Sequence, residues 1–494
     1  MSWWQRWRLV IVLGMTYVYF FQGSDPNQHS RLLLTRSLAD GAGLTLGADH
    51  GLTIDKSEHA GEFYCDKAPG LSLLAVPIWK LTEWLDRASG VDTSIFYVDR
   101  ARLHTITFVL CGLAGIWCSY SVRKAAERLG ASAARAEGFA LVFGLGTLVF
   151  PFSTALFGHV MSAALIAHAF QLLIKHQLSE TLRPAELVQL GFCFALSIVT
   201  EYPSGLLVAC LGLSYLHWEH RTSPKTLQQW TKHLLPLVSL AAPLLLLHSW
   251  YLWRAFGKPW ALPYGFVFEP KFRIHHDKGL LGVQLPSPEG LIGVFLTPYR
   301  GLFFFCPVLL LSLWGISRWL RRKDFGTLPV TVMACLVCYS MFNTAYYAWD
   351  GGGSIGPRHI IPLLPMWTLG SVFVVGKWPE RTHALLAVFS VSMMLIATAV
   401  LLHLGGDDVL FSSPMYSTVW PSWFRGELSL NTQSIFRAEP RADASYNLGT
   451  LFGLRPHLSV GLLVVMWFLM YPPRVLKALL FSIPSASARS EATP

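Results

Sequence analysis

The residues best suited to chemistry in this chain are a few ionisable side chains that stand at the ends of long apolar runs. Asp25 follows the first run in "GSDPNQHS", and Asp66 adjoins Lys67 in "CDKAPG". A carboxylate can accept a proton from a hydroxyl group, and an ammonium group can neutralise an anion. These two stretches therefore favour acid–base chemistry on an anionic substrate.

Further polar residues stand at the same end of later apolar runs. They are Arg31, His159, Glu201, Tyr202, Tyr299, Arg300, Asp350, Arg358 and His359. Ionisable groups beside a bilayer are costly, so they mark either a site or a paired structural role. Delivery of these residues by five separate loops to one face favours a site.

Each of these residues also has a plainer interpretation. Asp25 could cap the helix that follows it, and Asp350 could cap the Gly-rich turn in "WDGGG". Arg300 and Arg358 could reach to lipid headgroups. His159 alone is more typical of a packing residue than of a ligand. The site interpretation depends on the whole set of residues rather than on any one of them.

The composition sets the environment of these residues. The chain has 494 residues, of which 53% are hydrophobic and 14% charged. Apolar runs of ~16–22 residues recur along it, and each is long enough to cross a hydrocarbon core of ~30 Å as a helix. We predict an all-α integral membrane protein with about twelve transmembrane helices. The predicted spans are 8–22, 101–121, 138–153, 157–174, 186–200, 202–218, 233–252, 301–317, 328–346, 358–376, 383–404 and 457–472.

Basic residues set the orientation. Connections such as "SVRKAAERLG" and "SRWLRRKDF" are dense in Lys and Arg and fall on the same side as the N-terminus. The positive-inside rule places both termini in the cytoplasm of a cell inner (plasma) membrane and the polar cluster on the outer side. The formal charge of +10 is explained by these inner loops, so it does not indicate a nucleic-acid partner.

Three long segments are predicted on the outer side, at residues 23–100, 253–300 and 405–456. The first should hold an interfacial helix from Arg31, a short extended piece in "LTIDK" and a second interfacial helix after Pro69. The third is polar, and we expect a mobile cover there.

The predicted organisation has three parts. Residues 1–376 form a catalytic module that includes the first two outer segments. Residues 377–476 add helices with the third outer segment, and residues 477–494 form a cytoplasmic tail that ends in disorder.

The polar cluster suits a substrate that carries a phosphate and a lipid tail. Lys67, Arg300 and Arg358 can neutralise the phosphate. Arg31, His159, Glu201, Tyr202, Tyr299, Asp350 and His359 would complete the substrate site. The alternatives are a transporter or flippase for an anionic lipid or solute, and a non-catalytic scaffold or lipid-binding subunit. A transporter would place ionisable groups at mid-membrane depth, where this chain offers mainly His168 and His248.

The order of motifs resembles that of the GT-C fold glycosyltransferases, in particular the bacterial relatives of protein O-mannosyltransferases and of lipid A aminoarabinose transferases. An acidic residue after the first helix, an interfacial helix and a Lys-Pro-Pro-like motif correspond here to Asp25, the helix from Arg31 and "DKAPG" with Lys67. The segments "FGHVMSAAL", "TEYPSG", "PYRGLFFFCPVLLL" and "WDGGGSIGPRHIIPLLP" add to the likeness, which covers most of residues 1–376.

The resemblance implies sugar transfer from a polyprenyl-phosphate donor to a lipid, glycan or protein acceptor, by a single displacement with inversion. Asp25 would act on the acceptor, Lys67, Arg300 and Arg358 on the leaving phosphate, and Glu201 and His159 on the sugar or acceptor.

The chain also departs from the family pattern. It has one Asp where many members have an acidic pair, and Ala68 replaces the usual second Pro. The choice of Asp25, Asp66 or Asp55 as base therefore stays open, as does a divalent metal at Asp25 or Asp66; no other cofactor is expected.

Overall fold

The computed structural model describes residues 3–23, 25–92, 96–178, 181–403, 412–431 and 444–481, and these residues are mainly helical. Two small antiparallel sheets are the exception to an all-α fold. One pairs β1 (Phe20–Phe21) with β4 (Tyr446–Asn447), and the other pairs β2 (Lys56–His59) with β3 (Glu62–Cys65). The predicted disordered tail end lies outside the described residues.

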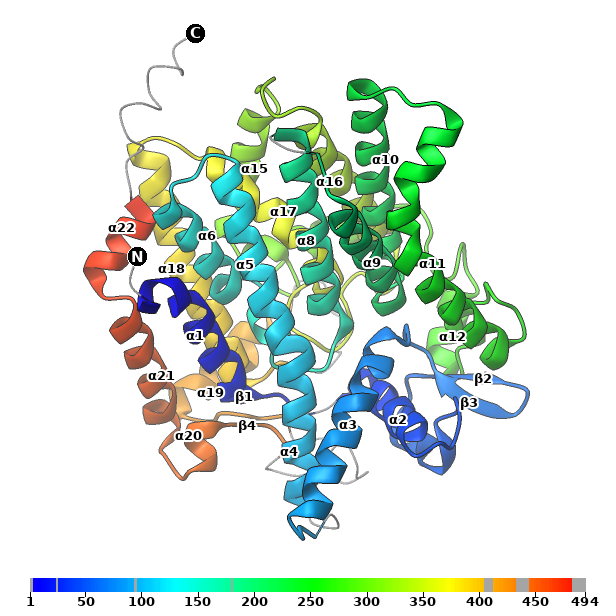
Figure 1. Ribbon diagram of the computed structural model, residues 1–494. Helices are drawn as coiled ribbons and strands as arrows, with labels where there is room; N and C mark the ends of the chain where they lie inside the picture. The colour runs from blue at the N-terminus through cyan, green and yellow to red at the C-terminus, as the bar shows by residue number, and fades with distance from the viewer. Residues whose placement is uncertain are drawn as a thin grey trace.

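The helices follow one another along the whole chain (Figure 1). The longer ones are α1 (Trp3–Tyr19), α2 (Pro26–Ala39), α3 (Gly70–Ala88), α4 (Phe96–Thr107), α5 (Leu113–Arg128), α6 (Ala133–Gly146), α8 (Gly158–Leu178), α9 (Pro184–Thr200), α10 (Ser204–Thr222), α11 (Leu227–Phe256), α15 (Val308–Trp319), α16 (Leu328–Ala345), α18 (Lys377–Val400) and α21 (Pro456–Met470). The shorter ones are α7 (Val149–Phe152), α12 (Pro270–His276), α13 (Pro288–Phe295), α14 (Leu302–Phe305), α17 (Leu364–Thr368), α19 (Trp420–Arg425), α20 (Leu448–Leu451) and α22 (Pro473–Phe481).

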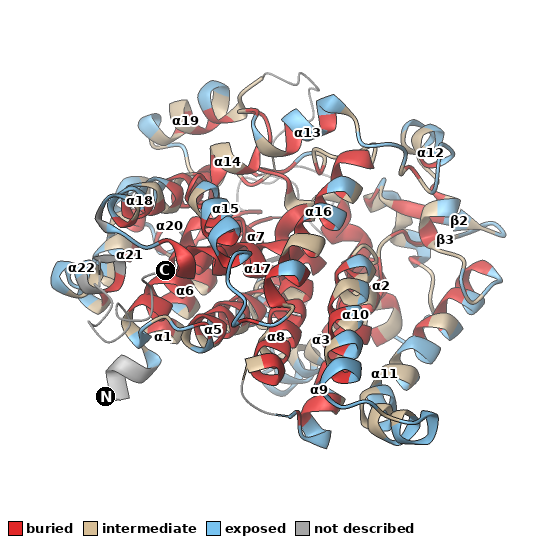
Figure 2. Cartoon of the chain, turned by 90° about the horizontal axis from the view of Figure 1, so that it is seen from above, coloured by how far each residue is buried: buried red, intermediate tan, exposed pale blue. Residues whose placement is uncertain are grey.

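Apolar side chains point outward from several helices, which indicates that lipid is their solvent. On α11, Leu246 is 69% exposed and Trp253 is 53% exposed, although α11 is among the most apolar helices. Figure 2 shows the same arrangement, with buried residues at the centre and exposed ones on the outward faces of helices such as α10 and α11. A water-soluble protein rarely exposes so large an apolar face.

Four helices among the described residues are long and apolar enough to cross a membrane. They are Val98–Arg128, Leu227–Phe256, Leu328–Ala345 and Trp378–Val400, and shorter apolar helices occur at Trp7–Tyr19, Pro184–Thr200, Val308–Trp319 and Pro456–Met470. The chain is therefore a multi-pass membrane protein, while the count of about twelve crossings stays a prediction.

Three of the predicted spans are not single helices. The span at 138–153 divides into α6 and α7, because Thr147 adopts an extended backbone. The span at 301–317 divides into α14 and α15. The span at 358–376 is a 3-10 turn (Arg358–Leu363), then α17, then a second 3-10 turn (Leu369–Phe373). Proline residues explain these breaks, because proline lacks the N–H that a continuous helix needs and clashes with the preceding turn.

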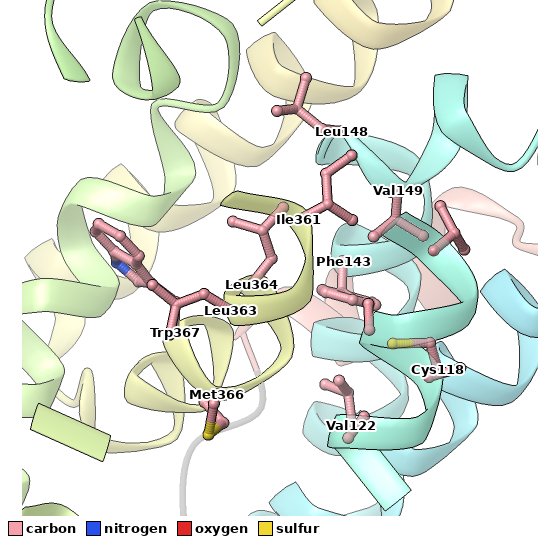
Figure 3. Packing of buried hydrophobic residues seen from close by; sticks show 14 of the residues in the cluster. Cys118, Val122, Phe143, Leu148, Val149, Ile361, Leu363, Leu364, Met366 and Trp367 are labelled. Carbon is pink, nitrogen blue, oxygen red and sulfur yellow. The ribbon is translucent and has the colours of Figure 1, made fainter. Parts of the chain in front are cut away.

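The broken segment at 358–373 lies in the centre of the core. Figure 3 shows Ile361 and Leu364 on the side of the segment that faces Phe143 of α6 and Val149 of α7, while the ring of Trp367 points away from them toward α15. All five of these side chains are at most 3% exposed. Dense packing of this kind fixes the start of the segment, where Arg358 and His359 stand.

The three segments predicted on the outer side gather at one end of the helical bundle, which we call the site end (Figure 1). It is formed by α2, β2 and β3, by α12, and by α19, α20 and β4. A backbone bridge between Ser57 and Val267 joins the first segment to the second, and the hydrogen bond from the N–H of Gly23 to Oγ of Ser445 joins the first to the third. The β1–β4 pair lies directly beside this contact. Tyr446 and Asn447 of the third segment are thus paired with the end of α1, while the expectation of a mobile cover stays a prediction. Residues 405–411 and 432–443 of that segment lie outside the described part.

Helix α11 depends on a close approach to α9, and this gives a first prediction. A side chain on Gly191 of α9 would collide with the carbonyl oxygen of Leu237. Small residues allow such contacts between membrane helices. Gly191→Ala should destabilise the protein by about 1–3 kcal/mol through overpacking, measured as a lower thermal midpoint in detergent. Gly461→Ala on α21 is the matched control, because it meets open space. Equal midpoints for the two variants would contradict this packing.

Candidate functional site

Asp25 caps α2 with one oxygen and presents the other to a cluster of cationic and imidazole groups. Oδ1 accepts a hydrogen bond from the backbone N–H of Gln28 at 2.9 Å. Oδ2 lies 3.3 Å from Nδ1 of His403 and 3.8 Å from Nη1 of Arg358. The helix begins at Pro26, five residues before the predicted start at Arg31. The expectation that Asp25 caps the next helix is confirmed, and the cap leaves Oδ2 available.

Arg31 lies six residues further along α2, and its guanidinium is fully engaged by the protein. Its side chain is 2% exposed, and Nη2 lies 3.0 Å from Oε1 of Glu201. Nε donates to Asn27 at 3.1 Å and Nη1 donates to the carbonyl of Ala68 at 3.3 Å. The guanidinium therefore joins α2 to the segment before α3 and to the end of α9.

Glu201 and His159 meet where α9 ends and α8 begins. Oε1 of Glu201 lies 3.5 Å from Nδ1 of His159. A side chain on Gly158 would collide with the same carboxylate, so glycine is required there. Burial raises the pKa of Glu201, while the charges of Arg31, Arg358 and Lys67 act in the opposite direction. The influence of three cations on one carboxylate shows how closely the cluster is drawn together.

Lys67 is held between two carboxylates at the start of α3. Its Nζ lies 3.0 Å from Oδ2 of Asp55 and 2.8 Å from Oδ2 of Asp66. Oδ1 of Asp66 accepts a hydrogen bond from Ser30 of α2 at 3.3 Å. Burial alone would lower the pKa of Lys67, but Asp55 and Asp66 outweigh it and raise that pKa. Burial raises the pKa of Asp66, against the effect of Lys67.

Tyr299, Arg300 and Asp350 form a network around the Gly-rich turn. The side chain of Arg300 is fully buried and donates to the carbonyls of Tyr299 at 3.2 Å and Gly352 at 3.1 Å. Asp350 accepts from the N–H of Gly352 at 3.0 Å and from the hydroxyl of Tyr299 at 3.4 Å. Gly351 and Gly352 have φ of 77° and 68°, a region that favours glycine. Asp350 thus caps this turn as expected, and the burial of Arg300 excludes a role as a headgroup anchor.

The aromatic residues of the candidate set lie against one another. The ring of His359 lies 5.4 Å from that of His159 and 5.8 Å from that of Tyr346. The ring of Tyr202 lies 5.8 Å from that of Tyr264, which the second outer segment supplies. These contacts place flat aromatic rings beside the ionisable groups of the cluster.

Several site residues were missed by the sequence analysis. They are His403, Asn27, Ser30, Tyr264, His276, Tyr346 and Tyr347. Tyr347 and His276 share a hydrogen-bond contact of 3.2 Å, and His276 stacks on Tyr264 at 5.5 Å. The dense aromatic pattern of "AYYAW" and the pair "HH" were the available signal for some of them. His403 gave none, because it stands alone at the end of an apolar run.

The carboxylates do not assemble a metal site in the described part of the chain. No group of three or more His, Cys, Asp or Glu side chains there could hold a metal ion. Asp66 faces the ammonium of Lys67, and Asp25 faces Arg358 and His403. Because cations of the protein already stand at both carboxylates, these residues do not fit a resident divalent ion.

A cavity of about 350 Å³ lies elsewhere, between α3 and α4. Its lining includes Leu85, Asp86, Ala101 and Arg102. None of the charged residues of the cluster lines it, so the cluster is identified by its side-chain geometry.

No family model matches this chain, and no curated protein matches it. Among solved structures, it is similar to ArnT from Cupriavidus metallidurans in the apo state, with 15% identity, a TM-score of 0.48 and coverage of 95% of this chain and 75% of that one. The undecaprenyl phosphate complex of ArnT gives 12% identity, a TM-score of 0.47 and coverage of 79% and 63%. The chain is also similar to the archaeal oligosaccharyltransferase AglB from Archaeoglobus fulgidus, in complex with an inhibitory peptide and a dolichol-phosphate. The identity is 13%, the TM-score is 0.49, and the match covers 82% of this chain and 57% of that one.

These proteins are of the class that the sequence motifs resemble. The chain spans less than two thirds of the length of the ArnT complex and of AglB. At TM-scores below 0.5 the likeness assigns neither a fold nor a function to this chain.

The buried Arg31–Glu201 pair gives the second prediction. Arg31→Met leaves the Glu201 carboxylate buried without its main partner, which should cost about 3–5 kcal/mol, measured by thermal unfolding in detergent. Adding Glu201→Gln should restore part of the loss, because no uncompensated charge then remains.

The matched control is Arg322→Met, which removes an exposed pair with Asp324 at 2.6 Å. That change should alter the stability by less than about 1 kcal/mol. Equal losses for Arg31→Met and Arg322→Met would exclude the proposed importance of the buried pair.

Proposed function

We propose that this chain is a membrane-embedded glycosyltransferase that moves a sugar from a polyprenyl-phosphate donor to an acceptor hydroxyl at the site end. The observation that carries the proposal is the arrangement at Asp25, whose Oδ2 faces Arg358 at 3.8 Å in a nearly buried cluster. A carboxylate that can take a proton then stands next to a cation that can hold a phosphate.

Arg358 is the cation best placed for the phosphate of the donor. Its ion pair with Asp25 is long, and its Nε has no hydrogen-bond partner among the described residues. The guanidinium also packs over the ring of Phe157 at 4.8 Å, which fixes its plane. A planar guanidinium with unused donors can bind two phosphate oxygens at once.

Lys67 would contribute a second positive charge to the same phosphate. Its position between Asp55 and Asp66 keeps it protonated and close to the cluster. The leaving phosphate gains negative charge as the bond to the sugar breaks, so cations fixed in advance are most useful at that step. Arg300 would act indirectly, because it holds the Gly-rich turn that precedes Arg358 in the chain.

The proposed reaction is a single displacement. The acceptor oxygen attacks the anomeric carbon, the bond from that carbon to the phosphate oxygen breaks, and Asp25 Oδ2 takes the proton of the hydroxyl group. Attack opposite to the leaving phosphate inverts the configuration at the anomeric carbon. Glu201 and His159 would line the sugar or the acceptor beside it.

Asp25 suits the role of base better than Asp66. Both oxygens of Asp66 are occupied, one by Ser30 and the other by Lys67. Asp25 uses Oδ1 for the cap and keeps Oδ2 within the cluster. A base must come within hydrogen-bond distance of the proton that it takes, which favours the carboxylate with an oxygen to spare.

The rival proposal of a transporter finds less support in the geometry. A transporter needs polar groups along a path between the two sides of the membrane. The ring of His168 lies 5.4 Å from that of Trp117, and its Nε2 lies 3.3 Å from Oε1 of Gln189. Trp117 and Gln189 do not belong to the cluster. His248 stacks on Tyr251 beside the site end. Neither histidine therefore extends the cluster toward the opposite side of the membrane.

The third prediction tests the base. Asp25→Asn keeps the side-chain oxygen that caps α2 but removes the proton acceptor, so transfer should fall by a factor of about 10²–10⁴. The measurement is transfer of labelled sugar from undecaprenyl-phosphate mannose, glucose and aminoarabinose to membranes of a deletion strain. Asp40→Asn, at the exposed end of the same helix, is the matched control and should keep full activity. No transfer by the unmodified protein from any of these donors, or full activity of Asp25→Asn, would overturn the proposal.

The fourth prediction concerns Lys67. Lys67→Ala removes positive charge from the leaving phosphate and should abolish transfer, whereas Lys67→Arg should keep a measurable part because the charge remains. Lys80→Ala, an exposed lysine of α3, is the control. Retention of full transfer by Lys67→Ala would mean that the lysine serves only to pair Asp55 and Asp66.

A further inference from the structure

His403 follows the end of α18 and places one ring nitrogen near Oδ2, the oxygen of Asp25 that does not cap α2. Its side chain is nearly buried, and Nδ1 lies 3.3 Å from Asp25 Oδ2. The ring stacks on Phe157, with centroids 6.0 Å apart and planes inclined by 30°. His403 is therefore fixed in its plane by one neighbour, and its buried Nδ1 lies near the carboxylate with no hydrogen-bond partner among the described residues.

The hydrogen bonds of Gln28 determine which nitrogen of His403 carries the proton. Oε1 of Gln28 accepts from the N–H of Leu156 at 2.8 Å, and Nε2 donates to the carbonyl of Gly23 at 3.3 Å. These two backbone partners assign the orientation of the amide, since exchanging its atoms would set like groups against each other. The NH₂ group of Gln28 lies 3.3 Å from Nε2 of His403.

An NH₂ group offers only protons, so Nε2 of His403 must be the acceptor. Burial lowers the pKa of His403, which keeps the ring neutral near pH 7, although Asp25 acts in the opposite direction. A neutral imidazole that accepts at Nε2 carries its proton on Nδ1. That proton stands next to Asp25 Oδ2. Arg358, His29 and the carbonyl of Gly353 are the other charged, titratable or accepting groups near the ring.

The chain beyond α18, which includes His403 and the third outer segment, also fixes the backbone just before Asp25. The N–H of Gly23 donates to Oγ of Ser445, and its carbonyl accepts from Nδ2 of Asn431. A side chain at Gly23 would collide with the carbonyl of Ala444. The same part of the chain therefore acts on both the main chain and the side chain of the Asp25 region.

We infer that His403 is a positioning residue for Asp25: in its Nδ1–H form it holds Oδ2 in the orientation that receives the acceptor proton. The inference rests on the proposed function for its role in transfer, and on the contacts of Gln28 for the form of the ring. His403 takes no part in bond making; the proton passes from the acceptor hydroxyl to Asp25. Contacts of this kind are often long before a substrate binds and shorten in the reacting complex.

The first arm of the test compares two replacements of His403. His403→Phe keeps an aromatic ring against Phe157 and removes the N–H, whereas His403→Asn offers an amide N–H near the position of Nδ1. In the transfer assay with undecaprenyl-phosphate sugars, kcat of His403→Phe should fall roughly tenfold to a hundredfold, with KM for the donor changed by less than about threefold. His403→Asn should recover most of the loss. His457→Phe, an exposed histidine at the start of α21, is the control.

The second arm is independent of activity. Protein labelled with ¹⁵N-histidine is measured by NMR, and the signals of His403 are assigned by their loss in His403→Phe. We expect Nδ1 protonated and Nε2 unprotonated, with the Nδ1 signal shifted in Asp25→Asn. An Nε2–H ring, or full kcat in His403→Phe, would overturn the inference. If the unmodified protein transfers no sugar, the proposed function fails and the role in transfer fails with it, while the NMR result still decides the contact.

Discussion

A guanidinium with 2% exposure cannot be left without acceptors, and this constraint on Arg31 determines where α2 lies. Its three partners come from α2 itself, from the segment before α3 and from the end of α9. The helix can occupy only the position where all three converge, because an unpaired buried charge costs several kcal/mol. Asp25 at the start of α2 and Ser30, the partner of Asp66, take their positions from the same helix. The positions of these site residues therefore depend on the Arg31–Glu201 ion pair.

The cations of the site differ in how closely the protein engages them, and this difference separates structural from functional roles. Arg31 and Lys67 stand 2.8–3.0 Å from carboxylate oxygens. Arg358 stands 3.8 Å from Asp25. An incoming phosphate competes most readily for a cation whose existing pair is long, since less interaction is lost. We therefore expect the incoming phosphate to bind first to Arg358. Lys67 would add positive charge at the edge of the same site.

The sequence predicted the parts of this structure that depend on local chemistry. Pro69 before Gly70 marked the start of α3. Asp25 before Pro26 offered a helix cap, although the predicted start at Arg31 was five residues late. The amphipathic and apolar runs located most of the longer helices. It could not show that 358–373 breaks into turns while staying in the core, because proline content alone does not separate a kinked helix from a broken one.

Pairings across long distances in the chain were also beyond the sequence. Arg31 and Glu201 are 170 residues apart, and both were selected as residues without known partners. His403 is 378 positions beyond Asp25, and a lone histidine after an apolar helix has no distinguishing pattern. Topology predicted that polar residues would gather at one end, and the structure supplies which of them touch.

The interpretations of Asp25 as a helix cap and as a base are compatible, because a carboxylate has two oxygens. Asp350 shows the contrast: one of its oxygens caps the Gly-rich turn and the other accepts from Tyr299, so both are used within the protein. Asp25 uses Oδ1 for the cap, and its Oδ2 faces the cluster. The cap also fixes the side chain, so that Oδ2 is already oriented before an acceptor binds. A carboxylate at a helix start can thus be structural through one oxygen and reactive through the other. A carboxylate whose two oxygens are both used within the protein is only structural, whereas one that keeps an oxygen outside the cap can also react.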